Sequence, residues 1–394
     1  MCSLYFYMNC ASAVLLFVGG NLRKITKLSF YNSPVSKQEI VIDRVADKNF
    51  LILTGYNGVG KSRVISMVYE TLALVRNIDS EINKFGWAAQ LDYEDGMAVR
   101  AIKMSRDGVA GDALQKYVYK LIEQNHSLKD FYCKVESHIN HKKSFANIGS
   151  NSEGGGQGFG CSTILRFNKR EAVDFGGSIE MVAYIDDQVY FNYNRDIPEK
   201  VFNGKVTIDR TIFTLLYDFL VFQGQRNSAK NVMYALLDEY MLSNKDFDLE
   251  EAKKYVASKV TDTQVFGAAS ENEGSPVFIE LNKFFTHTER KLVWVEGHPC
   301  MLLNSGDLVP WHSFSKGEKT LLALMLTVYL YGDTADFVFD EPDLSLHMEW
   351  QKMLLPAFLS LAPNAKFIIS THSPAMVFNT SSEQVINMAR YHKG

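Results

Sequence analysis

Short apolar runs separated by polar turns characterise residues 24–54, which contain ITKLSFY, EIVIDRV and NFLILTG. Runs of this length, bounded by turn residues, predict three strands, and the last leads directly into a glycine-rich loop. After the loop, Val64, Val68, Leu72 and Val75 recur at helical spacing. The pattern therefore predicts a buried strand, a loop and an amphipathic helix in that order.

The middle of the chain has a different pattern of hydrophobic and polar residues. Residues 77–147 read as mostly helical and polar, and residues 149–162 (GSNSEGGGQGFGCS) read as a flexible loop. Strands are predicted at TILRF, IEMVAYI and VYFNYN, and helical patterns dominate from 211 to 287. No internal repeat and no long run of heptads is found.

The last hundred residues return to short alternating elements. They contain the strand KLVWVEG, a Leu-rich helix after Ser315, the strand DFVFD, a helix around Trp350 and the strand KFIIS. Strands that alternate with helices predict an α/β fold.

Composition narrows the class of protein. The 394 residues are 46% hydrophobic and 22% charged, which is typical of a globular protein with a full core. The net charge of −4 gives no overall basic bias towards nucleic acid. Five cysteines without a CxxC pair predict neither a disulfide framework nor a zinc ribbon, and they fit a reducing cytoplasm. Residues 1–20 are apolar but lack the basic start of a signal, so we expect an extra leader segment rather than a membrane anchor.

The loop after the third strand reads GYNGVGKS, which matches the phosphate-loop pattern G-x-x-x-x-G-K-[ST]. Its backbone N–H groups would face phosphates, Lys61 would reach the β and γ phosphates, and the Ser62 hydroxyl would ligate magnesium. The position between a buried strand and an amphipathic helix is the one that this loop requires. The predicted nucleotide-binding residues here are Gly55, Asn57, Gly58, Gly60, Lys61, Ser62 and Arg63.

A second motif is the apolar strand FVFDEP, which ends in adjacent carboxylates. This is the expected form of a Walker B element. Asp340 would hold magnesium, and Glu341 would orient and polarise the attacking water. Without other motifs, a strand that ends in two acidic residues is more often followed by a solvated turn. Together with a phosphate loop in the same chain, it indicates a Walker B element.

Two further elements accompany these motifs. Ser315, Gly317 and Glu318 open the Leu-rich helix, where free N–H groups form an anion site. The alternative there is an ordinary capping box of Ser315 and Glu318. His372 ends the strand KFIIS, at a position suited to a hydrogen bond with the γ phosphate or the water, although a histidine at a strand end is usually structural.

The order and spacing of the four motifs resemble an ABC-type ATPase: Walker A, signature, Walker B and switch histidine. Ser315 lies 25 positions before Asp340, and His372 lies 31 positions after Glu341. The resemblance implies an ABC-type P-loop NTPase head that binds ATP and Mg2+ and hydrolyses ATP with Glu341, His372 and Lys61. It also implies a dimer or higher homo-oligomer, in which the signature of one subunit completes the site of another.

Two departures from the motifs of ABC transporters narrow the choice of family within the ABC-type ATPases. The segment EPDLSLH resembles the E-P-D/E-x-x-L-H form of RecF-, Rad50- and OLD-like ATPases, and the signature reads SKGE instead of SGGQ, which argues against a transporter. The strand end YFNYNR stands where a Q-loop is expected, which makes Arg195 a candidate contact with nucleotide. Missing heptads argue against Rad50 and SMC proteins, and the 22 residues after His372 leave no room for the TOPRIM domain of OLD enzymes.

The long separation of Lys61 and Ser315, 254 positions, implies an inserted lid or partner-binding part. The expected organisation is a leader at 1–20, head segments at 21–75, 163–210 and 289–394, a mainly helical insertion at 76–162 and a helical lid at 211–288.

This combination most resembles the stand-alone ATPases of bacterial anti-phage systems of the Septu, retron-associated or PARIS type. The resemblance implies a cytoplasmic ATPase that restrains or activates a separately encoded effector, a nuclease, in response to a phage trigger protein or DNA. One alternative is a RecF-like DNA-binding ATPase in repair. Another is a nuclease in its own right, but His138 and His141 are too isolated to form its metal site.

Overall fold

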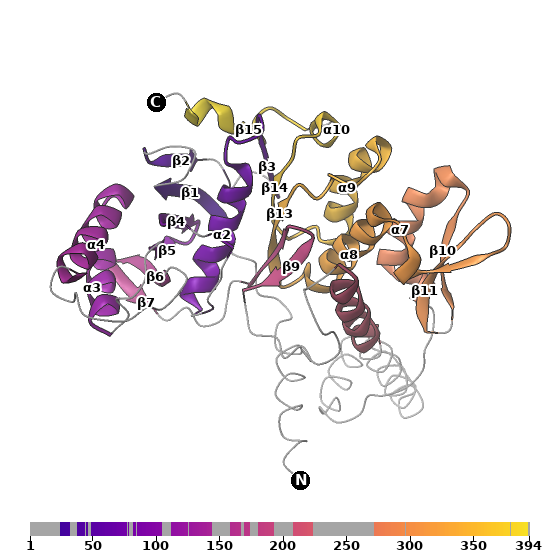
Figure 1. Ribbon diagram of the computed structural model, residues 1–394, viewed down its shortest axis with the longest axis horizontal. Helices are drawn as coiled ribbons and strands as arrows, with labels where there is room; N and C mark the ends of the chain where they lie inside the picture. The colour runs from indigo at the N-terminus through magenta and orange to yellow at the C-terminus, as the bar shows by residue number, and fades with distance from the viewer. Residues whose placement is uncertain are drawn as a thin grey trace, which may run out of the picture.

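The computed structural model describes residues 24–31, 38–43, 45, 49–76, 78, 82–83, 85–104, 112–124, 126–143, 158–166, 169–173, 180–192, 208–223, 272–295, 297–378 and 380–392. These residues form the predicted α/β fold, with two six-stranded sheets, a helix between them and further helices on the outer faces (Figure 1). The leader at 1–20 and Arg195 lie outside the described residues.

The first sheet carries the predicted motifs. Its strand order is β15 (Val385–Asn387), β3 (Phe50–Thr54), β14 (Phe367–Ser370), β13 (Ala335–Asp340), β8 (Glu180–Ile185) and β9 (Gln188–Phe191). The first five strands are parallel, and β9 pairs antiparallel with β8. Ser370 is the register partner of both Leu53 and Asp340, so the strand ends that lead into the motifs meet at one edge.

The second sheet is antiparallel, in the order β2 (Ile40–Asp43), β1 (Ile25–Tyr31), β4 (Trp87–Tyr93), β5 (Met97–Lys103), β6 (Gly158–Arg166) and β7 (Lys169–Val173). The prediction of a mostly helical segment at 77–147 is wrong for β4 and β5, which form a hairpin around Gly96 at φ +80°. Both strands are buried on nearly every residue, so the alternation that identifies a strand is missing.

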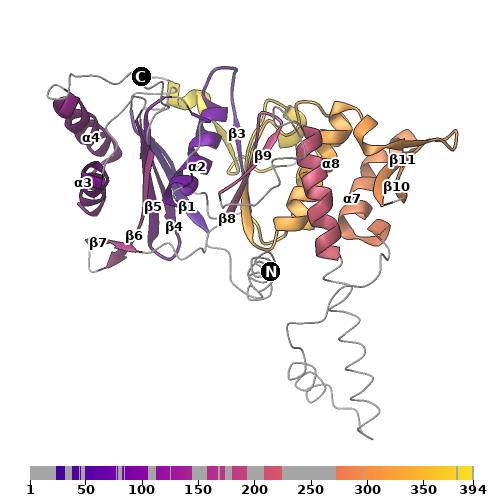
Figure 2. The same cartoon turned by 60° about the horizontal axis from the view of Figure 1, so that its bottom comes forward.

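Helices α3 (Asp112–Glu123) and α4 (Leu128–Lys143) confirm the prediction over their own ranges. They cover the outer face of the antiparallel sheet, where Val118, Ile122 and Phe131 join Ile102 of β5 in one apolar cluster (Figure 2). The end of the predicted Gly/Ser loop, 158–162, is also a strand, because it belongs to β6. A Cβ on Gly160 would lie 2.5 Å from the backbone nitrogen of Val75, so glycine lets β6 approach the neighbouring helix.

That neighbouring helix is α2 (Lys61–Val75), the predicted helix after the phosphate loop. It lies between the two sheets and has buried residues on all sides, from Val64 to Leu74 (Figures 1 and 2). Its one buried acid, Glu70, accepts hydrogen bonds from Trp87 and Asn83 and pairs with Lys103 at 2.8 Å. The sandwich fixes the helix, and therefore the loop that precedes it.

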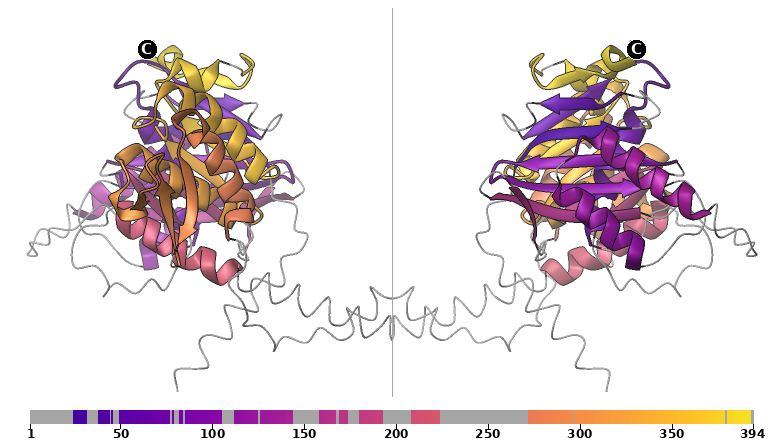
Figure 3. Two further views of the ribbon diagram at one scale, coloured as in Figure 1. Left: turned by 90° about the vertical axis from the view of Figure 1, so that its right-hand side faces the viewer. Right: turned by 90° about the vertical axis from the view of Figure 1, so that its left-hand side faces the viewer.

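The other face of the parallel sheet carries α7 (Pro276–Phe285), α8 (Lys316–Tyr331), α9 (Met348–Leu361) and a helical stretch at 208–223. Ring contacts, stacked, tilted or edge-on, among Phe337, Phe339, Phe358 and Phe367 join α9 to the sheet. A three-stranded sheet of β10 (Lys291–Val295), β11 (His298–Leu302) and β12 (Leu308–Pro310) lies beyond α7 (Figure 3). The short helix α10 (Pro374–Val377) follows β14.

Among the described residues, no helix is long and apolar enough to cross a membrane. Cys133, Cys161 and Cys300 are free thiols.

Candidate functional site

The loop between β3 and α2 has the backbone that its glycines predict. Gly55 has φ +136°, and a Cβ there would lie 3.0 Å from Val59 Cγ2 and 3.2 Å from Asn387 Oδ1. Gly60, at φ +85°, is the N-cap of α2 and provides no side-chain cap for the first N–H groups of the helix. These N–H groups and the helix dipole make the start of α2 suited to an anion.

Lys61 is folded back onto this loop. Its side-chain nitrogen donates to the carbonyl oxygens of Gly55 at 3.3 Å and Tyr56 at 3.4 Å, and lies 2.6 Å from His372 Nε2. Burial lowers the pKa of Lys61, and the carboxylates of Glu341 and Asp340 oppose that effect. The ammonium group is thus close to both predicted Walker B acids.

Asp340 ends β13 among hydroxyl groups. The Ser370 hydroxyl, from the end of β14, donates to Asp340 Oδ1, and the Ser62 side chain also hydrogen-bonds to this carboxylate. Burial raises the pKa of Asp340, and the two hydroxyl hydrogen bonds lower it. Ser62 and Asp340, 278 positions apart in the sequence, are therefore direct neighbours in the fold.

Glu341 follows in a left-handed backbone conformation with φ +45°. This conformation is uncommon for a non-glycine residue and persists only where its surroundings enforce it. Here the Glu341 N–H group donates to the Ser370 carbonyl at 3.0 Å and to the Ser370 hydroxyl at 3.2 Å. The turn directs the carboxylate towards His372, where Oε1 lies 3.2 Å from Nε2.

His372 Nε2 thus faces two groups with opposite requirements. The Lys61 ammonium can only donate, and the Glu341 carboxylate can only accept. One ring nitrogen cannot satisfy both at once, so the proton on Nε2 decides which neighbour His372 binds. The geometry makes His372 the link between the phosphate loop and Glu341.

The sequence did not predict the side chains that hold the segment around His372 in place. Thr371 donates to Asp343 Oδ2 at 2.8 Å, and Ser373 donates to Gln351 Oε1 at 2.6 Å. Gln351 Nε2 in turn donates to the Asp343 carbonyl at 3.1 Å. Asp343 was marked by the EPD pattern, but nothing in the sequence singles out Gln351, which reaches the loop from α9.

The turn of residues 315–318, which we call the signature turn, lies elsewhere. It opens α8, which packs with α7 and α9 on the face of the parallel sheet opposite α2 (Figure 2). The capping box is present, because the Ser315 N–H group donates to Glu318 at 2.8 Å and the Glu318 N–H group donates to Ser315 Oγ at 3.4 Å. A Cβ on Gly317 would lie 2.6 Å from the carbonyl oxygen of Ser345, so this turn approaches the segment after Glu341.

The remaining predicted residues have different surroundings. Asn57 and Gly58 are exposed at the tip of the phosphate loop, and the Arg63 guanidinium lies 4.5 Å above the Phe85 ring. His138 is half-buried and stacks on Tyr117 with ring centroids 4.1 Å apart. His141 lies in α4, and its side chain is outside the described part.

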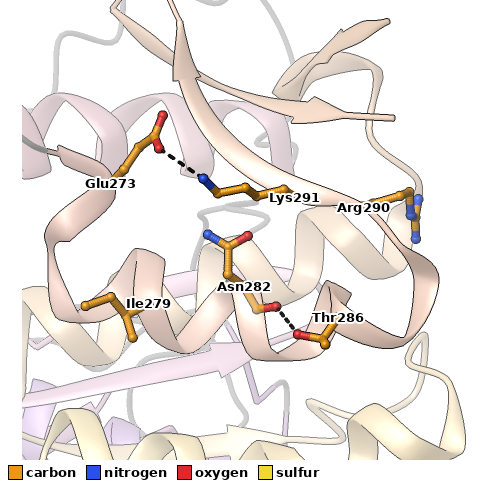
Figure 4. A pocket seen from close by; sticks show the side chains of 6 residues that line it. All are labelled: Glu273, Ile279, Asn282, Thr286, Arg290 and Lys291. Atoms are coloured by element: carbon orange, nitrogen blue, oxygen red, sulfur yellow. Dashed lines mark hydrogen bonds and ion pairs between the residues drawn. The ribbon is translucent and has the colours of Figure 1, made fainter. Parts of the chain in front are cut away.

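A hollow of about 420 Å³ lies on another part of the surface, between α7 and β10 (Figure 4). It contains none of the predicted site residues, and Glu273 and Lys291 face each other across it at 3.7 Å.

Comparison with known proteins gives partial matches. Residues 301–377 match the family described as "AAA domain, putative AbiEii toxin, Type IV TA system", a stretch that contains the signature turn, Asp340, Glu341 and His372. The chain is 31% identical over 99 residues to "Retron Vc95 probable ATPase" of Vibrio cholerae, which covers 21% of this chain and 19% of that protein. It is 32% identical over 83 residues to "Retron Ec83 probable ATPase" of Escherichia coli, which covers 18% of this chain and 15% of that protein. These matches confirm the predicted resemblance to ABC-like ATPases of anti-phage systems.

Solved structures give distant matches. The SMC head domain from Thermotoga maritima is 12% identical with a TM-score of 0.37, covering 90% of this chain and 91% of that one. The Smc head domain bound to the C-terminal domain of ScpA, derived from Pyrococcus furiosus, is 15% identical with a TM-score of 0.41, covering 91% and 92%.

Proposed function

We propose that this chain binds ATP with Mg2+ and hydrolyses it at the carboxyl edge of the parallel sheet. The observation that carries the proposal is the convergence of Lys61, Asp340, Glu341 and His372, which come from three separate segments of the chain. A phosphate-binding loop, a half-buried carboxylate, a second carboxylate and a histidine within hydrogen-bonding reach are the parts that phosphoryl transfer to water requires.

The phosphate loop supplies the binding energy. The N–H groups at the start of α2 would hold the phosphates, and Lys61 would exchange its contacts with the Gly55 and Tyr56 carbonyls for contacts with the β and γ phosphates. This exchange requires little movement, because the ammonium group already lies over the loop.

Ser62 and Asp340 fit a magnesium ion. The Ser62 and Ser370 hydroxyls and the Asp340 carboxylate are hard oxygen donors, and a cation stabilises the anionic form of a carboxyl group whose pKa is raised by burial. Few protein ligands are needed, because Mg2+ beside ATP is held largely by phosphate oxygens and water. When bound, the ion would neutralise charge on the phosphates.

Glu341 is the group best placed to orient water. Its enforced backbone turn directs the carboxylate to the edge of the site, where it can accept a proton from a water molecule in line with the γ phosphate. His372, directly beside Glu341, would exchange the contact of its Nε2 with Lys61 or Glu341 for a hydrogen bond to a phosphate oxygen.

Steady-state hydrolysis by the purified protein tests this proposal. Lys61→Ala should abolish ATP binding and turnover, whereas Glu341→Gln should retain binding and lose at least roughly 100-fold in kcat. Glu349→Gln removes an exposed carboxylate of α9 that pairs with Lys352 at 2.8 Å, and serves as the control. Full activity of Glu341→Gln would refute the assigned role of that residue.

The signature turn points to a second chain. Because α8 lies on the opposite face of the sheet from α2, the signature turn and the helix of its own phosphate loop are on different faces of the sheet. We propose that Ser315, Gly317 and Glu318 complete the nucleotide site of a second copy, in a dimer or higher oligomer. ATP-dependent dimerisation of Glu341→Gln, observed by light scattering and lost in Lys61→Ala, would support this arrangement.

The cellular role that fits these features is anti-phage defence. The chain matches two retron-associated probable ATPases but spans only 19% and 15% of their lengths, so the role of the whole protein is part of the proposal. We propose that ATP binding or hydrolysis controls a separately encoded effector, a nuclease, when a phage trigger is present. Glu341→Gln in cells that carry the complete set of neighbouring genes should lose protection, and unchanged protection would refute this control.

A further inference from the structure

Arg290 connects the three-stranded sheet to the signature turn. It directly precedes β10, after Glu289 has ended the preceding 3-10 turn with φ +53°. Its guanidinium donates from one terminal nitrogen to Glu318 Oε1 at 2.5 Å and from Nε to Thr288 Oγ1 at 3.1 Å. The same group lies 5.9 Å from the centroid of the Phe285 ring. Three contacts therefore hold this side chain in one orientation.

Glu318 is engaged by both of its oxygens. Oε2 accepts the Ser315 N–H group at 2.8 Å, and Oε1 accepts Arg290, while the side chain is only 9% exposed. The reciprocal half of the capping box, from the Glu318 N–H group to Ser315 Oγ, is longer at 3.4 Å. The backbone of Ser315 is thus held mainly by the Glu318 carboxylate, and Arg290 orients that carboxylate.

The turn is also held on its other side. Gly317 lies against the carbonyl of Ser345, and Ser345 Oγ donates to Thr320 Oγ1 at 3.1 Å. The signature turn is therefore clamped between Arg290 and the segment that follows Glu341. A change in the orientation of Arg290 would alter how the N–H groups of this turn are presented.

We propose that Arg290 is a positioning residue for ATP hydrolysis, which presents the signature turn to the nucleotide bound by a second copy of the chain. The proposal rests on the proposed function. In this proposal, Arg290 lies between α7 and β10 and affects hydrolysis in the partner's nucleotide site through the signature turn. It does so without touching the phosphate loop of its own chain. Arg290 also lines the hollow between α7 and β10, so whatever occupies that hollow touches the side chain that orients Glu318.

The chain offers a matched control in the next residue. Lys291, the first residue of β10, carries the same charge, but its side chain is 63% exposed and reaches Glu273 across the hollow at 3.7 Å. Figure 4 shows the side chains of Arg290 and Lys291 pointing in different directions. Lys291→Ala should leave ATP turnover unchanged within about twofold, because exposed ion pairs contribute little.

The test compares nucleotide binding with turnover. Arg290→Ala should lower kcat by roughly 10-fold, the size expected for a hydrogen bond to a buried charged group, while the Kd for ATP stays within about twofold. Arg290→Gln keeps a hydrogen-bond donor without the charge, so its kcat should lie between those of the wild type and Arg290→Ala. The double variant Arg290→Ala with Glu318→Ala should be no slower than Glu318→Ala alone, because both act through one contact.

Two results would overturn the inference. One is wild-type kcat in an Arg290→Ala protein with an unchanged circular dichroism spectrum. The other is a double variant whose loss equals the product of the two single losses. A wild-type protein that hydrolyses no ATP would instead refute the proposed function, so the two failures are distinguishable.

Discussion

Some residues of the site belong to a sequence motif and could be predicted. Others can be identified only from their positions in the folded chain. Lys61, Asp340 and Glu341 were predicted because each occupies a fixed place in a pattern, and the structure brings them to one edge. Ser370 was not predicted, although it contacts both Asp340 and Glu341. A serine at a strand end is too common to be informative, and its role depends on the parallel pairing of β13 with β14.

Gly317 allows a prediction about a single added methyl group. Its Cβ would lie 2.6 Å from the Ser345 carbonyl, a backbone atom that cannot simply rotate away. Alanine is the better helix former by about 1 kcal/mol, but the strain of overpacking outweighs this gain. We expect Gly317→Ala to lower the free energy of unfolding by about 1–2 kcal/mol, measured by urea denaturation.

The control for this substitution is Lys316→Ala in the same turn. It removes an exposed side chain that pairs with Asp187, and its effect should stay within about 0.5 kcal/mol. A Gly317→Ala protein as stable as the wild type would show that the Ser345 segment moves freely away from the turn.

At the scale of elements, the sequence predicts those with a visible period. The strands β1, β3, β13 and β14 and the helix α2 lie where apolar runs and helical spacing indicated. The β4–β5 hairpin was missed because α2 covers one face of these strands and α3 and α4 cover the other. Both faces of these strands are buried, and the buried residues include the polar Gln90, Arg100 and Lys103, so the apolar and polar alternation that identifies a half-buried strand is missing.

The buried pair of Glu70 and Lys103 ties α2 to β5. Glu70 is fully buried, and its carboxylate also accepts Asn83 and Trp87. Lys103→Met should leave this carboxylate without its cation and lower the free energy of unfolding by about 3–5 kcal/mol. Urea denaturation measures the loss.

A double-mutant cycle identifies the cause of that loss. Adding Glu70→Gln to Lys103→Met removes the unpaired charge, so the double variant should be more stable than the sum of the two single effects predicts. Simple additivity would mean that the cost of Lys103→Met comes from packing of the lysine side chain.

At the scale of the whole molecule, the sequence predicts the α/β class but not how the two sheets join. The joint depends on residues far apart in the sequence, such as Asp336 of β13 and Lys366 just before β14. No local pattern distinguishes these two from surface charges, yet both are buried. Their environment follows from tertiary packing alone.

Asp336 gives the molecule a pH dependence. Burial raises the pKa of Asp336 to about 7, although the hydrogen bond and charge of Lys366 act in the opposite direction. The native state therefore binds a proton that the unfolded state has released between about pH 4 and pH 7, and stability falls as pH rises through this range. Asp336→Asn should remove this dependence and gain roughly 2–4 kcal/mol relative to the wild type between pH 4.5 and pH 8. Urea denaturation of both proteins at pH 4.5 and pH 8 measures their free energies of unfolding. The assignment would be refuted if the free energy of unfolding changed equally in Asp336→Asn and in the wild type between the two pH values.

Lys366 joins the two sheets directly. Its side-chain nitrogen donates to the carbonyls of Ile25 at 3.2 Å and Val45 at 2.6 Å, which belong to the antiparallel side of the molecule. Its backbone N–H group donates to Asp336 Oδ1 at 2.8 Å on the parallel side. Lys366→Met keeps the apolar stem but leaves two buried carbonyls without this donor.

We expect Lys366→Met to lower the free energy of unfolding by about 2–4 kcal/mol, because each buried acceptor that loses its partner costs about 1–3 kcal/mol. Hydrogen exchange should accelerate at the start of β1 more than in β13, since the lost bonds end on the antiparallel sheet. Equal acceleration in both sheets would mean that the lysine stabilises the core as a whole. Faster exchange confined to the β1 side would show that Lys366 holds the antiparallel sheet to the parallel sheet at the edge where β14 begins, which is opposite to the edge that carries Asp340 and Ser370.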